Sequence, residues 1–322
     1  MRRLTTLLAA ASFLLPCALR AEGLLDLLGQ NPNKKPITEE FYAGDPLSKE
    51  KVALLSLDGV ILSQKLPLGG TMDIVETLRM QLAYAAKDAD LKGILLEIDS
   101  PGGGITASEI LHRAMADTKT KGKKIVALME DLAASGGYFV AAAADRIYAH
   151  PSTITGSIGV IIKSVNVEGL YGKIGLQDVT IKSSNTPLKD MLSSTRPMTE
   201  EEKKIMQGLI DQMYDLFVGT VSKDRNLPME KVRKLADGRV YTSSEAKAAG
   251  LIDEIGFRDD ALTGLYKLCG LKKEPKIVRY RKTFNLQDLF SPGIGGLAPH
   301  QMLEQVLTGA AAAPRFMYLW QP

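Results

Sequence analysis

Short apolar runs alternate with helical patterns after residue 50, and this alternation limits the fold more than any other feature of the sequence. Residues 51–62 and 91–100 are rich in apolar and β-branched side chains, and the second run is nearly continuous, as in a strand buried on both faces. Between them, apolar residues recur at helical spacing from Ile74 to Ala86. Residues 123–130 form a third apolar run. Strands that alternate with helices predict an α/β fold with a mostly parallel sheet and right-handed crossovers.

Helix starts are predicted where a threonine precedes a glutamate by three residues, the pattern of a capping box. Such pairs occur at three places: Thr106 with Glu109, Thr199 with Glu202, and Thr242 with Glu245. The second pair opens a long amphipathic helix, and the third opens a short helix between two strands within residues 237–256. Residues 145–150 and 156–165 predict a further pair of strands.

The two ends of the chain differ in composition from the predicted body, which spans residues 51–280. Residues 1–21 contain two arginines, an apolar stretch and small residues, the pattern of a secretory signal or an uncleaved membrane anchor. Residues 22–50 hold several prolines and predict a linker. Residues 281–322 predict a flexible tail, whose apolar end either stays disordered or docks on a partner subunit or the membrane. We therefore expect an exported protein, whose leader is either removed or kept as a membrane anchor.

Charge and cysteine content exclude several classes of protein. The 40 basic and 37 acidic residues are spread along the chain without a strong basic block, which argues against a nucleic-acid partner. The only cysteines are Cys17 and Cys269, and removal of the leader would leave a single thiol and no intramolecular disulfide. The same count excludes zinc and iron–sulfur sites of the cysteine type. We expect no cofactor and no metal ion.

Two glycine-rich turns follow two of the predicted strands. In "IDSPGGGIT", Gly102 to Gly104 leave backbone N–H groups uncovered by side chains, as in a turn that holds an anion. The turn lacks the G-x-G-x-x-G spacing of a dinucleotide site, and a purely structural tight turn is the alternative. In "AASGG", small residues surround Ser135 at the start of an alanine-rich helix, where an N-capping serine is the alternative. The two turns should meet at one end of the parallel sheet, where active sites gather.

A serine nucleophile needs a base, and histidine is one candidate. The chain has three histidines, His112, His150 and His300. His112 lies within a predicted helix and His300 in the tail, so that only His150 is a candidate for a Ser-His-Asp arrangement with Ser135.

A lysine is the other candidate, provided that its surroundings keep it uncharged. Burial lowers the pKa of a lysine from about 10.4 toward 7 or 8. Lys189 fits this requirement, because "TPLKDML" sets it between Leu188 and the apolar residues Met191 and Leu192.

Several motifs agree with one known family. They are "IDSPGGG", "AASGGYFVAAAADRIYAHPSTITGSIGV", "IKSSNTPLKDML", "EEEKKIMQGLIDQMYDLFVGTV" and "DGRVYTSSEAKAAGLIDEIG", within about residues 50–270. In these motifs and their order the chain resembles the short, single-repeat members of the signal peptide peptidase SppA (protease IV) family of bacterial Ser-Lys serine proteases.

The resemblance implies a ClpP- and crotonase-like α/β spiral of βαβ units. It implies that Ser135 is the nucleophile, that Lys189 is the general base, and that the N–H groups of Gly103 and Gly136 bind the oxyanion. It also implies a membrane-associated ring of identical copies that share active-site elements between subunits.

Two further residues enter through this resemblance. Short family members read "KSGxxKD", whereas this chain reads "KSSNTPLKD", which is two residues longer and has Ser184 in place of the glycine. Lys182 is therefore the alternative base. Ser157, in the intact "STITGSIGV" segment, is a candidate for orienting the lysine amine.

Three functions are consistent with these features. The leading one is a serine endopeptidase that degrades cleaved signal peptides and other apolar or misfolded segments at the membrane. A crotonase-like acyl-CoA enzyme is the second, because that fold also builds an oxyanion hole from glycine turns, although export argues against a cytoplasmic substrate. The third is a non-catalytic scaffold in a membrane quality-control assembly.

Overall fold

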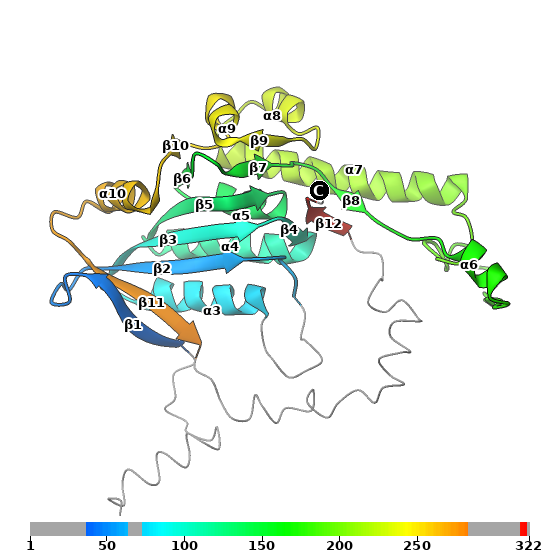
Figure 1. The fold of residues 1–322 in the computed structure, drawn as a ribbon, viewed down its shortest axis with the longest axis horizontal. Coiled ribbons are helices and arrows are strands. Elements are labelled where there is room, and N and C mark those ends of the chain that lie inside the picture. The colour runs from blue at the N-terminus through cyan, green and yellow to red at the C-terminus, as the bar shows by residue number, and fades with distance from the viewer. Residues whose placement is uncertain (1–36, 64–72, 283–315, 321–322) are drawn as a thin grey trace, which may run out of the picture.

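The computed structural model describes residues 37–63, 73–282 and 316–320. Within these residues, a nine-stranded sheet runs in the order β1-β11-β2-β3-β5-β6-β10, with β7 added beside β5 and β9 beside β7 (Figure 1). The strands are β1 (Ile37–Gly44), β2 (Lys51–Asp58), β3 (Leu91–Ser100), β5 (Lys124–Ala134), β6 (Arg146–Ala149), β7 (Ile154–Gly156), β9 (Val240–Thr242), β10 (Glu254–Ile255) and β11 (Lys276–Lys282). All pairs are parallel except β1 with β11 and β7 with β9. The predicted α/β class with a mostly parallel sheet is confirmed.

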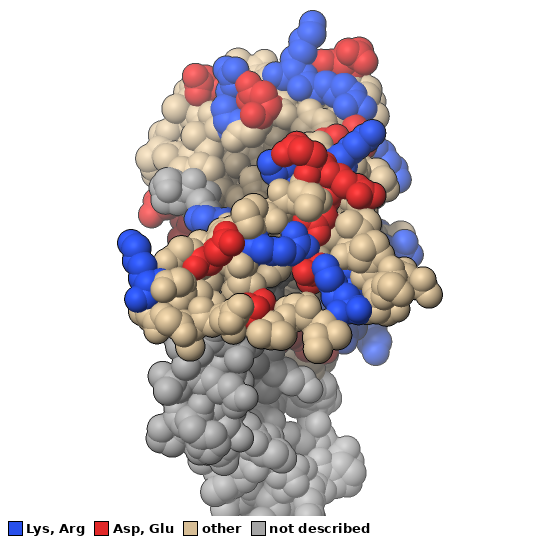
Figure 2. Space-filling model, turned by 90° about the vertical axis from the view of Figure 1, so that its right-hand side faces the viewer, with Lys and Arg blue, Asp and Glu red and all other residues tan. Residues whose placement is uncertain are grey.

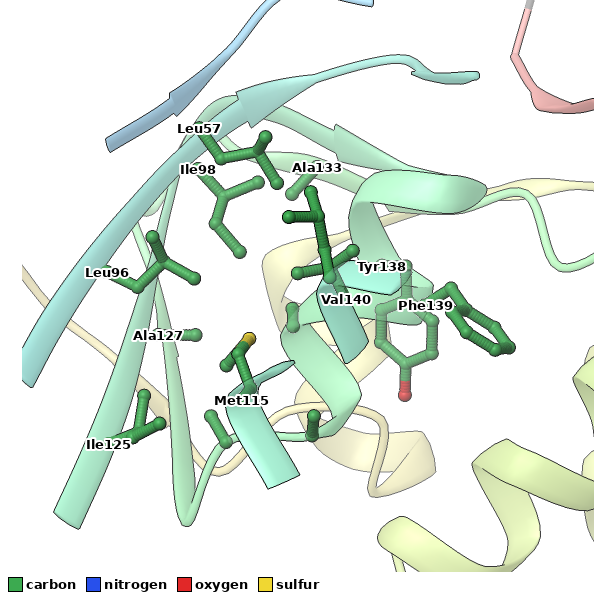
Figure 3. Packing of buried hydrophobic residues seen from close by; sticks show 14 of the residues in the cluster. Leu57, Leu96, Ile98, Met115, Ile125, Ala127, Ala133, Tyr138, Phe139 and Val140 are labelled. Carbon is green, nitrogen blue, oxygen red and sulfur yellow. The ribbon is translucent and has the colours of Figure 1, made fainter. Parts of the chain in front are cut away.

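Helices cover both faces of this sheet. The helices of the described residues are α3 (Ile74–Lys87), α4 (Ile105–Thr120), α5 (Gly136–Ala142), α6 (Glu168–Lys173), α7 (Glu200–Asp224), α8 (Met229–Leu235), α9 (Ser243–Ala249) and α10 (Arg258–Cys269). On one face, α3, α4 and α5 pack against the side chains of β2, β3 and β5 in the main core (Figure 3). On the other face, α10 contributes Ala261 and Leu265 to a second core.

Strand β3 explains why both faces are covered. Its residues Ile94, Leu96 and Ile98 belong to the main core, whereas Leu95 belongs to the core under α10. Successive side chains of a strand point to opposite faces, so a continuous apolar run needs a partner layer on each side. The prediction of a strand buried on both faces is confirmed.

The predicted capping boxes have different outcomes. Thr199 with Glu202 caps α7, and Thr242 with Glu245 caps α9, as predicted. The box at Thr106 is wrong, because α4 already begins at Ile105 after Gly104 and has no side-chain cap. The helix starts earlier because it follows directly on β4 (Gly102–Gly104), which is held by a hydrogen bond from Gly104 N to Ile61 O of 2.8 Å.

Two segments outside the predicted body belong to the fold. Strand β1 lies in the predicted linker 22–50, yet it pairs with β11 along its whole length. Strand β12 (Phe316–Leu319) lies in the predicted flexible tail 281–322, yet it is the middle strand of a small antiparallel sheet with β4 and β8 (Ile161–Ile162). Both predictions are corrected: backbone pairing with distant strands orders these segments.

The predicted leader, residues 1–21, lies outside the described residues. In the part of the chain that the structure describes, none of the helices combines the length and the hydropathy that a membrane crossing requires.

A long connecting segment joins β8 to α7. Residues 163–196, hereafter the arm, contain α6 and a series of turns, and they lie beside the N-terminal part of α7, away from the main sheet (Figure 1). Several apolar side chains of the arm are more than half exposed: Val165, Leu170, Ile174, Leu176, Val179 and Ile181. On one chain alone, these side chains have no covering layer.

Candidate active site

Ser135 occupies the sharp turn between the central strand β5 and helix α5. Its backbone has φ of 54° and ψ of −114°, a conformation that is strained for any residue other than glycine. Its side chain makes no capping hydrogen bond, so the alternative of an N-capping serine is wrong. A strained serine in a strand–turn–helix is the arrangement of a nucleophile elbow, in which the backbone presents the hydroxyl to a bound substrate.

The two glycine-rich turns meet beside Ser135. A Cβ on Gly102, whose φ is 95°, would lie 2.5 Å from the backbone nitrogen of Gly136. A Cβ on Gly136 would lie 2.5 Å from Ser108 Oγ and 3.1 Å from the Cα of Gly102. Both positions therefore require glycine, because any side chain would push the two turns apart. The two turns therefore meet at one end of the sheet, as expected from the sequence.

The amide groups of the first turn point in alternating directions. The N–H of Gly102 donates to Ser100 Oγ at 3.1 Å, and the N–H of Gly104 donates to Ile61 O at 2.8 Å. Since the backbone groups of a strand alternate, the N–H of Gly103 points to the opposite side, where β12 lies. The N–H of Gly136 is the first of α5 and has no partner within the helix.

Strand β12 fills the groove between these donors and β8. Its Tyr318 pairs with Gly103. The carbonyl oxygen of Tyr318 lies so close to Gly102 and Gly136 that a Cβ added to either glycine would be 2.1 Å or 3.0 Å from it, respectively. A carbonyl of an extended chain thus sits among the glycines next to Ser135. The groove thus holds this segment of the chain as an antiparallel strand, with backbone pairing to β4 on one side and β8 on the other.

The Tyr318 side chain lies in an aromatic pocket under the groove. Its ring is fully buried, 4.5 Å from the ring of Phe217 and 5.2 Å from that of Phe139 between centroids. Its hydroxyl donates to the carbonyl of Met213 at 3.1 Å. Burial raises the pKa of the Tyr318 phenol, so that it remains a hydrogen-bond donor at neutral pH.

A cavity of about 430 Å³ opens next to Ser135. It is lined by Ser135, Ser157, Gly159, Val160, Ile161, Ile210, Asp211, Tyr214, Ala236, Asp237, Gly238 and Leu319. Ser157 is buried, and its backbone has a positive φ of 49°. Ser157, from the "STITGSIGV" segment, thus lines the same cavity as Ser135. The walls of the cavity are mainly apolar.

No lysine lines this cavity in the described part of the chain, so a single chain does not bring Lys189 to Ser135. Lys189 lies on the arm, exposed to solvent. Lys182, the alternative base, donates to Asp190 Oδ1 at 2.6 Å and to the carbonyl of Pro187 at 2.9 Å. These contacts hold the Lys182 amine within the arm, and Lys182 does not line the Ser135 cavity.

The described histidines also lie outside the cavity. His150 Nε2 is 3.2 Å from Glu130 Oε2, and its ring packs edge-on against Phe257. His112 Nε2 is 2.5 Å from Asp224 Oδ2 and belongs to the contact between α4 and α7. His300 lies outside the described residues. The structure therefore does not assemble a Ser-His-Asp arrangement on Ser135.

Sequence reasoning missed two features of this site. One is β12, whose aromatic residues alternate with Met317 and Leu319, a period of two that is typical of a strand. The other is a set of ion pairs that links the loop of Lys189 to α7 through Arg196, Asp190 and Glu202. Those charges gave no signal in the sequence, because the pairing depends on how the arm folds back onto the helix.

The sequence matches the family model "Peptidase family S49" over residues 117–272 and the model "Clp protease" over residues 53–157. A protein of Enterococcus faecium assigned as signal peptide peptidase SppA is 40% identical over 248 residues, which are 75% of this chain and 68% of that protein. Protease 4 of Salmonella typhi is 37% identical over 198 residues, 62% of this chain and 32% of that longer protein.

The chloroplastic serine protease SPPA of Arabidopsis thaliana is 32% identical over 284 residues, 84% of this chain and 40% of that protein. Among solved structures, a ClpP1 variant of Listeria monocytogenes has a TM-score of 0.43 and 16% identity, over 65% of this chain and 94% of the other. By its sequence relationships the chain belongs to peptidase family S49, together with the SppA and protease 4 enzymes, and it is a serine peptidase.

Proposed function

We propose that the protein is an endopeptidase with a Ser-Lys dyad, in which Ser135 is the nucleophile and Lys189 is the general base. The observation that carries this proposal is the position of β12, an extended chain whose Tyr318 carbonyl lies among the glycines beside Ser135. A substrate bound in the same way would present its scissile carbonyl to the Ser135 hydroxyl. Hydrolysis of peptide bonds is the chemistry that such an arrangement serves.

The mechanism follows from the donors around that carbonyl. Ser135 Oγ attacks the carbonyl carbon while Lys189 Nζ accepts the hydroxyl proton, and the N–H groups of Gly103 and Gly136 stabilise the oxyanion. Lys189 then returns the proton to the leaving amine, which departs as the acyl-enzyme forms. Lys189 next takes a proton from water as the water oxygen attacks the ester carbon. It gives that proton to Ser135 Oγ when the ester bond breaks, which releases the second product and restores the free serine and the uncharged lysine. Ser157, at the cavity wall, is suited to orient the lysine amine.

The lysine comes from a second copy of the chain in this proposal. Lys189 lies on the arm, outside the Ser135 cavity of its own chain, and the arm exposes a row of apolar side chains that a neighbour would cover. A head-to-tail contact repeated around a closed ring gives every Ser135 one arm from the next copy. The ring predicted from the resemblance would thus be needed for catalysis as well as for stability.

The substrates that suit this site are extended, apolar segments. The cavity walls include Val160, Ile161 and Ile210, and the groove binds backbone without need for a folded partner. The relative from Enterococcus faecium carries the name of a signal peptide peptidase. We therefore assign cleaved signal peptides and misfolded apolar segments as substrates, at the outer side of the cytoplasmic membrane, where the predicted leader would deliver the protein.

The first test compares two inactivating substitutions with a matched one. Ser135→Ala and Lys189→Ala should each lower cleavage of an apolar fluorogenic peptide at least about a thousandfold, because each removes one half of the dyad. Lys173→Ala, which removes another exposed lysine of the arm, should leave the rate unchanged. Full activity of Ser135→Ala would exclude Ser135 as the nucleophile, and turnover by Lys189→Ala would exclude Lys189 as the base. No cleavage by the assembled wild-type protein would instead support a non-catalytic scaffold.

Mixing the two inactive proteins tests whether the dyad is shared between copies. In an equal mixture that exchanges subunits, about a quarter of the sites combine an intact Ser135 with an intact Lys189 from the next copy. We expect activity to return to about that fraction of the wild-type rate. A mixture that stays inactive after proven subunit exchange would mean that each chain supplies its own lysine.

A further inference from the structure

Four charged side chains surround the backbone next to Lys189, and we call them the arm network: Lys182, Asp190, Arg196 and Glu202. Asp190, the residue that follows Lys189, accepts hydrogen bonds from Lys182 Nζ at 2.6 Å and from Arg196 Nε at 3.0 Å. Arg196 also donates to the backbone carbonyl of Asp190 at 3.2 Å. The side chain and the backbone of Asp190 are therefore both held by one guanidinium.

The other end of the network is anchored to α7. Arg196 donates to both carboxylate oxygens of Glu202, at 2.9 and 2.5 Å. The Glu202 side chain is only 2% exposed, and it also accepts the N–H of Thr199 at 2.8 Å in the capping box. A planar guanidinium that binds one carboxylate bidentately while it holds another is a rigid link. It ties the Lys189 loop to the first turn of a 25-residue helix.

The network also balances charge beside the lysine. Two carboxylates meet two cations, so no negative charge of the network is left over. Hydrogen bonds from Arg196 and then from Lys182 hold the pKa of the Asp190 carboxyl well below its usual range, and Arg196 lowers the pKa of Glu202 to about 2. Within the described residues, no hydrogen bond or ion pair reaches the Lys189 amine.

Together, these contacts give Arg196 a role in the chemistry of Lys189. We propose that Arg196 is a positioning residue that keeps Lys189 available as an uncharged base, by holding the Asp190 carboxylate away from it and fixing the loop to α7. This inference rests on the proposed function of Lys189. Without Arg196, the Asp190 carboxylate would keep Lys182 on Oδ1 but lose the partner of Oδ2. That oxygen would be free to turn to the Lys189 amine, and an opposite charge at ion-pair distance favours protonated lysine. A protonated lysine cannot accept the proton of Ser135.

Other charged groups around the arm are accounted for. Glu168, on α6, lines the same hollow as Lys182, Asp190 and Arg196. Asp178 accepts hydrogen bonds from the hydroxyls of Thr180 and Thr195. On the arm end of the molecule, acidic and basic side chains are interspersed without a broad area of one sign (Figure 2). Asp190 is thus the carboxylate closest to Lys189 in the chain, and substitution of Arg196 leaves one of its two oxygens without a cationic partner.

The test is the pH dependence of kcat/KM for the assembled full-length protein with an apolar fluorogenic peptide. Wild-type activity should rise with pH as the lysine becomes uncharged. Arg196→Gln should move this rise to higher pH by about one unit, which corresponds to a tenfold lower rate on the acidic limb. The double variant Arg196→Gln with Asp190→Asn should move it back, because the released carboxylate is gone. Arg233→Gln, which breaks the comparable pair with Asp215, should leave the profile in place.

The outcomes separate a positioning role from a structural one. A lower kcat for Arg196→Gln with an unshifted profile, or a double variant that keeps the shift, would overturn the proposal. Should Arg196→Gln fail to fold, Asp190→Asn alone decides. This variant must stay active, and the pH at which its activity rises must stay in place or move lower. A move of this rise to higher pH contradicts the proposal. Failure of the dyad itself is seen separately, as turnover by Lys189→Ala.

Discussion

Gly102 shows how closely single residues are fitted around the nucleophile. Gly102→Ala would strain a backbone with φ of 95° and place a methyl group 2.1 Å from the carbonyl oxygen of Tyr318, where a substrate carbonyl would bind. We expect a loss of stability of about 1–2 kcal/mol from the backbone and a fall in kcat/KM of at least about a hundredfold, comparable to loss of an oxyanion donor.

Gly122→Ala is the matched control for this substitution. Its φ of 81° imposes a similar strain, but nothing lies within 4 Å of the new methyl group. Chemical denaturation should show only the loss of about 1–2 kcal/mol that comes from backbone strain, with peptide cleavage unchanged. Equal loss of activity in both variants would mean that strain alone, and not blockage of the groove, explains the effect of Gly102→Ala.

Individual residues of the site could be predicted where their role depends only on neighbours in the sequence. The small residues around Ser135 and the bare amides of the first turn could be read from the sequence, since both are properties of short segments. The proposed partnership of Ser135 with Lys189 could not be derived from spacing, because the proposal places the two residues in different segments and on neighbouring chains. Arg196 gave no signal for another reason: its partners Asp190 and Glu202 lie six residues before and after it, a spacing at which neither a helix nor a strand brings side chains into contact.

Helix α7 offers a test at the scale of one element. Thr199→Ala removes the side chain that accepts the N–H of Glu202 at 3.2 Å, and it should lower the free energy of unfolding by about 1 kcal/mol. Thr106→Ala, at the capping box that was wrongly predicted, should change it by less than about 0.5 kcal/mol, since Thr106 is exposed and caps nothing. Urea unfolding of both variants measures the difference, and equal losses would contradict the assigned helix starts.

Most elements could be predicted from the sequence, and those that were missed share a cause. The helices and central strands carry their own apolar periodicity, and two of three capping boxes were correct. Strands β1 and β12 were assigned to a linker and a tail, because short strands at an edge are ordered by partners distant in sequence. Tyr318 pairs with Gly103 across more than two hundred residues, and no local pattern reveals such a partner.

Within the described residues, the arm carries a series of exposed large apolar side chains. Ile181 is 93% exposed and Val179 is 75% exposed, and burial of such side chains against a second copy would drive assembly. Ile181→Asp should therefore yield folded but dissociated chains with little peptidase activity. Leu47→Asp, at a site that is 89% exposed in the turn between β1 and β2, should keep the wild-type mass and rate. Analytical ultracentrifugation beside the peptide assay distinguishes the two, and a dissociated, fully active Ile181→Asp would exclude a lysine supplied by a neighbour.

The separation of the arm from the Ser135 cavity has a consequence for the cell that makes this protein. Under the proposed shared dyad, a lone chain holds Ser135 and Lys189 in two places that do not meet, so a single copy would be harmless to its surroundings. Peptide cleavage would then depend on how many copies have gathered, and it would rise steeply once they are abundant enough to close a ring. Dilution would lower the peptidase activity of the same molecules without any inhibitor, because it separates the copies.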